Sequence, residues 1–110
     1  MQYHLGGNFL LIRTYYAQND IEALLSLLET MRLYILRSKK MTTKEKKGYM
    51  NLLRFTKKLV YLRYEYPMLK KDIFEKRYRV LEEKVDATDN IIGRSWLKEE
   101  LQGILQKVVH

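Results

Sequence analysis

Apolar residues recur every three or four positions along most of this chain, a spacing typical of amphipathic α-helices. The pattern predicts four or five helices and no strands. The first helix is expected over about residues 8–18, and its start is blurred by two adjacent glycines. One face of it is apolar, and consists of Leu5, Phe9, Ile12 and Tyr16.

The second helix is expected from about residue 20 to Arg37. Asn19 and Glu22 form a capping-box pattern at its start. Apolar side chains surround most of its circumference, namely Ile21, Leu24, Leu25, Leu27, Leu28, Met31, Tyr34 and Ile35. A helix with so little polar face is expected to be buried on two sides, so this helix is predicted to be the central one.

Thr42 and Glu45 repeat the capping-box pattern and open a long third helix, which is expected to end near Arg63 or Tyr64. At about 100° per residue, two faces separate. The apolar face consists of Tyr49, Leu52, Leu53, Thr56, Leu59 and Val60. The opposite, polar face consists of Lys44, Lys47, Asn51, Arg54 and Lys58.

The last third of the chain predicts two more helices. Pro67 suits the first turn of the fourth helix, which is expected to reach about Val85. Its core positions are Phe74, Tyr78, Leu81 and Val85. After a polar loop at 86–90, the fifth helix is expected to begin between Asn90 and Ser95 and to end near Val108. Its core stripe is Leu97, Leu101, Ile104, Leu105 and Val108, and Trp96 is expected to anchor its start.

These elements predict an all-α fold and a single domain spanning residues 1–110. Four to five antiparallel helices are expected, arranged as a helical hairpin, a long basic helix and a C-terminal helical pair. A chain of 110 residues with 46% hydrophobic content is large enough for one buried core.

The first hairpin resembles a known repeat. Tyr15 and Tyr16, the Asn19–Asp20 turn and the apolar residues that follow are similar to the tetratricopeptide repeat. Asn19 stands where that family usually has glycine, and Leu24 and Met31 stand where it prefers alanine. A second copy is not found at the family's period of about 34 residues, because its turn would fall inside the third helix. The resemblance implies a tetratricopeptide-like hairpin that serves protein–protein interaction.

A wider pattern, from "LLIRTYYAQND" to the closing "WLKEEL", resembles the C-terminal segment of large uncharacterised repeat-containing proteins of Bacteroidota. This resemblance implies a helical end-module of a longer scaffold. The first helix would then lack an upstream neighbour, and its apolar face at Leu5, Phe9 and Ile12 would favour association with a second copy.

The net charge of +8 is concentrated in one segment. Between Arg37 and Arg63 there are ten lysines and arginines and one acid, Glu45, so this segment carries +9 and the rest of the chain carries −1. Such a patch indicates an anionic partner more strongly than a high isoelectric point does.

Seven of these cations form the candidate binding site, namely Arg37, Lys39, Lys40, Lys44, Lys47, Arg54 and Lys58. They could dock an acidic protein surface, or neutralise several phosphates of a nucleic acid while Tyr61, Tyr64 and Tyr66 stack on bases. A third interpretation is a solvated helix face with no partner. Tyrosines 15, 16, 34, 49 and 78 fall in apolar stripes and are expected in the core.

Groups that carry out catalysis are sparse. The chain has no cysteine, and its two histidines, His4 and His110, lie near opposite ends without a carboxylate cluster. The serines lack the histidine and aspartate context that activates a hydroxyl, and the paired acids Glu82–Glu83 and Glu99–Glu100 diverge on their helices. We therefore expect no enzyme activity, no metal and no cofactor.

The N-terminus lacks the pattern of a signal peptide, and no apolar run approaches the ~20 residues that cross a bilayer. The expected location is cytoplasmic, without membrane binding. The expected function is a non-enzymatic interaction or scaffold module that docks a partner, preferably an acidic protein, through an exposed helix face. A module that binds nucleic acid without sequence preference is the alternative.

Overall fold

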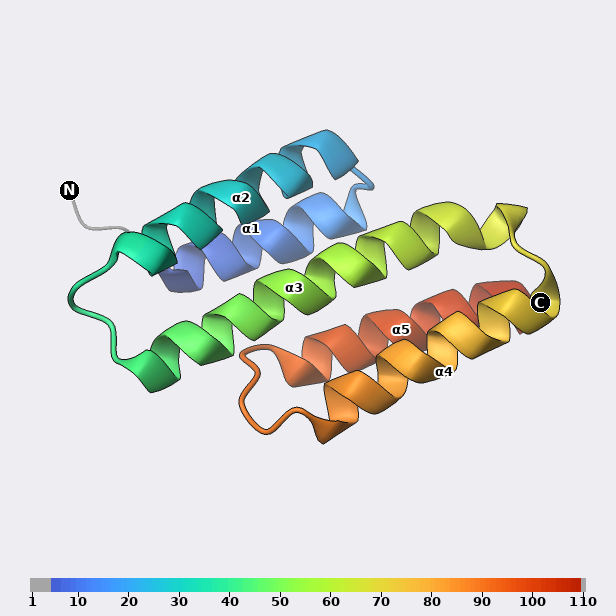
Figure 1. Cartoon of the computed structure of the whole chain (residues 1–110). Coiled ribbons are helices and arrows are strands. Elements are labelled where there is room, and N and C mark those ends of the chain that lie inside the picture. The colour runs from blue at the N-terminus through green and yellow to red at the C-terminus, as the bar shows by residue number, and fades with distance from the viewer. Residues whose placement is uncertain (1–4, 110) are drawn as a thin grey trace. The chain divides into compact units, whose positions relative to one another are not determined.

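A computed structural model of the chain describes residues 5–109, and all secondary structure in this range is helical. Five α-helices and one short 3₁₀-helix follow one another along the chain, and no strand occurs between residues 5 and 109 (Figure 1). The all-α class predicted from the sequence is therefore confirmed. The chain divides into two compact units, residues 1–42 and 43–110, where the sequence suggested one domain.

The first unit is a pair of helices, α1 (Leu5–Ala17) and α2 (Ile21–Arg37), which pack against each other (Figure 1). The turn between them is built on Asn19, whose φ of 57° is left-handed. The amide of Asn19 donates to the carbonyl of Tyr16 at 3.1 Å, and the amide of Asp20 donates to that of Tyr15 at 3.0 Å. These two bonds form a Schellman motif, which satisfies the last carbonyls of α1.

The N-cap of α2 differs from the prediction. Asp20, not Asn19, is the capping residue, and its carboxylate accepts a 3.2 Å hydrogen bond from the amide of Ala23. Asn19 cannot serve as N-cap because it already closes α1 in the left-handed conformation, which asparagine tolerates better than most residues.

Within the first unit α2 buries one stripe, where the sequence predicted burial on two sides. Its buried residues are Leu24, Leu28, Met31 and Ile35, which form one stripe at helical spacing. Tyr34 is 37% exposed and Leu36 is 54% exposed. The apolar circumference seen in the sequence therefore leaves several large side chains accessible.

The second unit consists of α3 (Thr43–Glu65), the 3₁₀-helix η1 (Tyr66–Met68), α4 (Lys71–Ala87) and α5 (Arg94–Val109). Each of the three α-helices packs against the other two (Figure 1). The broadest burial in the unit is on α3, whose buried positions are Gly48, Asn51, Leu52, Leu53, Phe55, Thr56, Leu59, Val60 and Leu62. Phe55 and Asn51, which lie outside the predicted apolar face, show that this helix is covered on more sides than its sequence pattern indicated.

The predicted start of the fourth helix is corrected. Pro67 lies in η1 and not in the first turn of the fourth helix, which begins at Lys71. A proline fits the 3₁₀ turn because its fixed φ suits that geometry and its missing N–H would have no helical partner there.

The core stripes predicted for the last two helices are largely confirmed. Phe74, Tyr78, Leu81 and Val85 are all at most 6% exposed. On α5, Leu97, Leu101 and Ile104 are buried, while Leu105 and Val108 are half-buried. Trp96 is 7% exposed and therefore belongs to the core of the second unit.

The connection from α4 to α5 is held by Arg94. Its guanidinium donates to the backbone carbonyls of Val85 at 2.7 Å, of Asp86 and Asp89 at 3.1 Å each, and of Thr88. A cation at this position also complements the negative end of the α4 dipole. In the last turn of α4, Asp86 forms an ion pair of 2.8 Å with Lys98 of α5.

Candidate functional site

The seven predicted cations are all exposed but are divided between the two units. Arg37, Lys39 and Lys40 belong to the first unit and the other four lie on α3 of the second. The structure therefore does not place all seven on one continuous stripe, and the four cations on α3 belong to the second unit.

On α3 the polar face is interrupted at Asn51, which the sequence placed on the solvent side. Asn51 is 9% exposed, and its side-chain amide donates a 2.8 Å hydrogen bond to the carbonyl of Asn90 in the α4–α5 connection. The side chain of Asn90 in turn donates to the carbonyl of Lys44 at 2.7 Å. The connection thus lies against α3 and separates Lys44 and Lys47 from Arg54 and Lys58.

Close approach of this connection depends on Gly48. A Cβ atom at that position would lie 2.7 Å from Oδ1 of Asn90 and 3.3 Å from Cγ1 of Ile92. The amide of Ile92 also donates to the carbonyl of Gly48 at 3.2 Å. Glycine at this position therefore lets the backbone of the connection approach α3 within hydrogen-bond distance.

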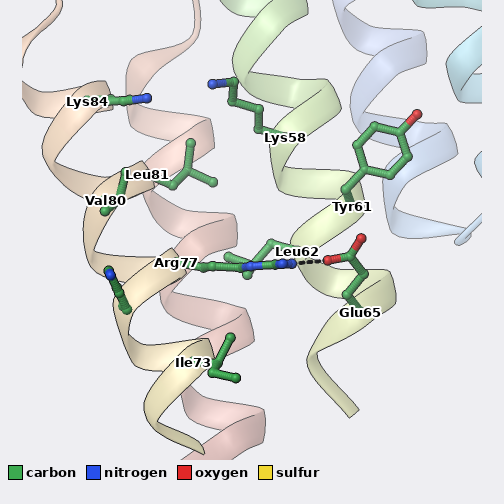
Figure 2. Close-up of a pocket in the computed structure, with 10 residues that line it drawn as sticks. Lys58, Tyr61, Leu62, Glu65, Ile73, Arg77, Val80, Leu81 and Lys84 are labelled. Atoms are coloured by element: carbon green, nitrogen blue, oxygen red, sulfur yellow. Dashed lines mark hydrogen bonds and ion pairs between the residues drawn. The ribbon is translucent and has the colours of Figure 1, made fainter. Parts of the chain in front are cut away.

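A groove lies between α3 and α4. Its volume is about 630 Å³. The lining residues are Lys58, Tyr61, Leu62, Glu65, Ile73, Lys76, Arg77, Val80, Leu81 and Lys84 (Figure 2). We call it the α3–α4 groove. Most of the surface between its charged side chains is apolar.

Large apolar side chains remain accessible along the α3–α4 groove. Tyr61 is 44% exposed, Ile73 is 42% exposed and Val80 is 43% exposed. Ile73 and Val80 are seven residues apart and therefore lie on one face of α4, two turns from each other. Exposed apolar residues that gather in a concave surface indicate a binding site more strongly than isolated ones do.

Three cations, Arg54, Lys58 and Lys84, meet at one end of the groove, and we call them the cation cluster. Lys58 and Lys84 extend from opposite helices to the same level of the groove (Figure 2). A smaller hollow of about 260 Å³ contains all three side chains together with Phe55. The guanidinium of Arg54 lies 4.7 Å from the centre of the Phe55 ring.

Ion pairs with acidic side chains would offset the positive charge of the cation cluster. Among residues 5–109, no carboxylate forms an ion pair with any of its three members. Partial burial lowers the pKa of Lys58 from its ordinary value, and the neighbouring charges of Lys84 and Arg54 lower it further. The local field therefore favours an anion at this end of the groove.

Further along the groove the positive charge is lower, because Glu65 offsets one of the two cations there, Lys76 and Arg77. Arg77 of α4 forms an ion pair with Glu65 of α3, which spans the groove (Figure 2). Ile73 lies beyond this pair. The groove thus has a strongly cationic end, an apolar middle and an end where Glu65 offsets part of the positive charge.

The α4 side of this site was missed from the sequence. Lys76, Arg77 and Lys84 were not among the predicted site residues, because they lie beyond the basic segment that ends at Arg63. A signal was present in the apolar pair Ile73 and Val80, which falls outside the predicted core stripe of that helix. Apolar residues off the core stripe indicate a second contact surface.

The predicted self-association face is less accessible than its sequence suggested. Ile12 is 0% exposed, so a second copy cannot reach it, while Leu5 and Phe9 are half-buried. The exposed apolar residues of α1 are instead Leu10, at 62%, and Leu11, at 39%. Leu10 and Leu11 are therefore the more accessible apolar residues of this helix, and self-association through Leu5, Phe9 and Ile12 stays a prediction.

The tyrosines separate into core and surface groups. Tyr16 and Tyr78 are buried as predicted, Tyr15 and Tyr49 are half-buried, and Tyr34 is exposed. Of the proposed stacking residues, Tyr61 and Tyr64 are exposed. The third, Tyr66, is half-buried and packs edge-on against Phe74 with ring centres 6.2 Å apart.

Within the described range, no three or more metal-binding side chains of histidine, cysteine, aspartate or glutamate cluster together. Both His4 and His110 lie outside that range. No described helix combines the length and apolarity that a membrane span requires. Comparisons with protein-family models, with curated proteins and with solved structures found no match for this chain.

Proposed function

We propose that this chain is a non-enzymatic helical module that binds an acidic partner protein through α3 and α4. The first hairpin would be the tetratricopeptide-like element of a scaffold, with antiparallel helices. The second unit would provide the docking surface. This proposal follows the sequence resemblance and the charge of residues 37–63.

The observation that carries the proposal is the coincidence of exposed apolar surface and uncompensated positive charge in the α3–α4 groove. Tyr61 and Val80 are more than two-fifths exposed beside the cation cluster. An acidic partner would cover the apolar residues and neutralise Lys58 and Lys84 in one step. Such complementarity gives both orientation and partner selection.

Nucleic-acid binding without sequence preference is the second candidate, supported by the lysines of α3 and by the exposed Tyr61 and Tyr64. The interruption at Asn51 counts against it, because the covered position lies between Lys44–Lys47 and Arg54–Lys58. A polyanion that follows α3 would meet the α4–α5 connection.

An anisotropy titration separates the two candidates. The probes are a fluorescein-labelled oligoglutamate peptide, a random single-stranded DNA and a random duplex, each at low and at physiological salt. The acidic-partner proposal expects oligoglutamate binding that a Lys47→Glu/Arg54→Glu/Lys58→Glu variant loses. Binding to DNA alone, lost in the same variant, would favour the nucleic-acid candidate. Absence of binding to all three probes at low salt would reject both.

A further inference from the structure

The α3–α4 groove has one side that is filled by the protein itself and one side that is open. Helix α5 packs against both α3 and α4, yet no residue of α5 lines the groove. Two contacting helices present a groove on each side of their contact, and α5 occupies only one of them. The open side therefore lies between two packed helices, which is the kind of surface against which a further helix can pack.

The length of the open groove sets the size of its occupant. Its α4 side extends from Ile73 to Lys84, eleven residues further along the helix. At 1.5 Å per residue this distance is about 16 Å, or about three helical turns. Accessible apolar side chains along this length lie at Ile73, Val80 and Tyr61, so they can receive apolar residues at i, i+3 or i+4, and i+7.

A helix fits this surface better than an extended segment does. The apolar middle of the groove, at Leu62, Val80 and Leu81, offers no backbone hydrogen-bond partners because these residues lie within helices. An extended peptide pressed against them would bury unpaired N–H and C=O groups, which is costly. A helix satisfies its own backbone and presents only side chains.

We infer that the α3–α4 groove binds a short amphipathic helix of the acidic partner, with the carboxylates of its last turn placed on Arg54, Lys58 and Lys84. This inference rests on the proposed function and names the partner's binding element. Its direction follows from charge: the C-terminal end of a helix carries partial negative charge, which favours the cationic end of the groove. Acidic side chains in the last turn add to the same attraction.

The opposite end of the groove is consistent with this direction. There Glu65 offsets the charge of Arg77, which leaves Lys76 as the excess cation, whereas the three members of the cation cluster gather at the other end. An acidic residue in the first turn of the bound helix would therefore contribute less to the binding free energy. The charge difference between the two ends selects one direction of the bound helix.

The test uses the full chain and blocked, fluorescein-labelled peptides of about 14 residues, or about four turns. The first peptide has leucines on one face and two glutamates in its last turn. The second has the same leucines and the glutamates in its first turn. The third keeps the terminal glutamates and replaces the leucines by serines. We expect the first peptide to bind at least ten-fold more tightly than either of the others.

Two protein variants locate the site. Lys58→Gln/Lys84→Gln removes two charges inside the groove, and Lys44→Gln/Lys47→Gln removes two charges on α3 beyond Asn90. The groove variant is expected to lose at least ten-fold in affinity for the first peptide, while the control loses less than three-fold. Amide shifts in nuclear magnetic resonance spectra should concentrate at Ile73, Val80 and Leu81.

Each other result overturns the inference in a recognisable way. Equal affinity for all three peptides, with equal loss in both variants, would retain an acidic-partner module but remove the helix and the groove. Preference for the second peptide would remove the assigned direction. If the first peptide fails to bind while oligoglutamate binds, only the inference fails. If oligoglutamate also fails, the proposed function fails with it.

Discussion

The side-chain amide of Asn51 donates a 2.8 Å hydrogen bond to the backbone carbonyl of Asn90, thirty-nine residues later in the chain. This bond joins the middle of α3 to the connection between α4 and α5. Asn51 is only 9% exposed, and the N–H group of its side chain has a hydrogen-bond partner. The relationship explains why a residue on the lysine-rich face of α3 is buried.

Replacing Asn51 by alanine should therefore destabilise the protein. The carbonyl of Asn90 would lose its donor, and we expect a loss of about 1–3 kcal/mol in the free energy of unfolding. Urea denaturation followed by circular dichroism measures it. Lys57→Ala, at an exposed position on the same helix, is the control and should change stability by less than about 0.5 kcal/mol. Equal stability of the two variants would show that the bond contributes little.

Gly48 and Gly103 provide a matched pair of helical glycines. Alanine usually stabilises a helix relative to glycine by about 1 kcal/mol. At Gly103 no atom lies within 4 Å of the added Cβ, so Gly103→Ala should be stabilising. At Gly48 the Cβ would lie 2.7 Å from Oδ1 of Asn90, whose side chain is held by the carbonyl of Lys44.

We therefore expect Gly48→Ala to lower stability by about 1–3 kcal/mol despite its better helix propensity. Thermal denaturation of both variants measures this difference: Gly48→Ala should lower Tm and Gly103→Ala should raise it. A stabilising effect at both positions would mean that Asn90 moves aside without cost. The α4–α5 connection would then be held less firmly to α3 than its hydrogen bonds indicate.

Lys58→Gln should raise stability slightly at neutral pH, because it removes the repulsion from Lys84 and Arg54. The gain should be a few tenths of a kcal/mol and should shrink as salt rises. Its pH dependence has a defined sign. Burial and like charges lower the pKa of Lys58 below 10.5, so the folded state releases this proton before the unfolded state does.

The destabilisation of the folded state by charged Lys58 is therefore complete at pH values below the pKa of Lys58 in the folded state. It disappears as pH rises towards 10.5. The difference between Lys58→Gln and the wild-type chain should disappear over the same range. Urea denaturation at neutral and at alkaline pH measures this change, with Lys57→Gln as the exposed control. A difference that stays constant with pH would contradict the electrostatic cause.

Tyr78 should make the protein sensitive to alkali. Burial, with a smaller effect of the Glu82 carboxylate, raises the pKa of Tyr78 to about 12 from its ordinary value of 10.0. The unfolded chain loses this proton first, so the stability due to Tyr78 is full below pH 10 and is lost as pH rises through 12.

Relative to the wild-type chain, Tyr78→Phe should gain about 1 kcal/mol between about pH 9 and about pH 11. Urea denaturation over this range measures the gain. The control is Tyr64→Phe, because Tyr64 is 63% exposed. If the stabilities of Tyr78→Phe and of the wild-type chain change in parallel with pH, Tyr78 is not the cause of the sensitivity to alkali.

Asp20→Ala should destabilise the first hairpin by about 1 kcal/mol, because the amide of Ala23 loses its capping carboxylate. Asp20→Ser keeps a capping oxygen and should recover most of this stability. Hydrogen exchange of the α2 amides locates the effect to the first unit. Equal exchange in both variants would show that the cap is not the cause.

Local patterns predicted the fold class and most helices because each depends on residues close in sequence. The stripe from Phe74 to Val85 is an example, since four side chains at helical spacing became the core of α4. The capping residue of α2 was displaced by one position because both Asn19 and Asp20 suit an N-cap. Only the left-handed backbone at Asn19 distinguishes them.

The candidate site was predicted less well because it depends on distant residues. Asn51 looked solvent-exposed because its partner, Asn90, belongs to a loop that periodicity does not place. Lys84 was missed because it joins Lys58 only after α4 packs against α3. The sequence could identify cations on α3, but not which of them would face an apolar groove.

The turn at Asn19 has a consequence for how this chain tolerates changes in length. Asp20 supplies the last bond of the motif that closes α1 and is also the cap that opens α2, so the turn contains no spare residue. Inserting one residue would break one of these functions or rotate α2 by about 100° about its axis. Single insertions and deletions should therefore be tolerated far less here than between residues 38 and 42, where neither of these motifs occurs.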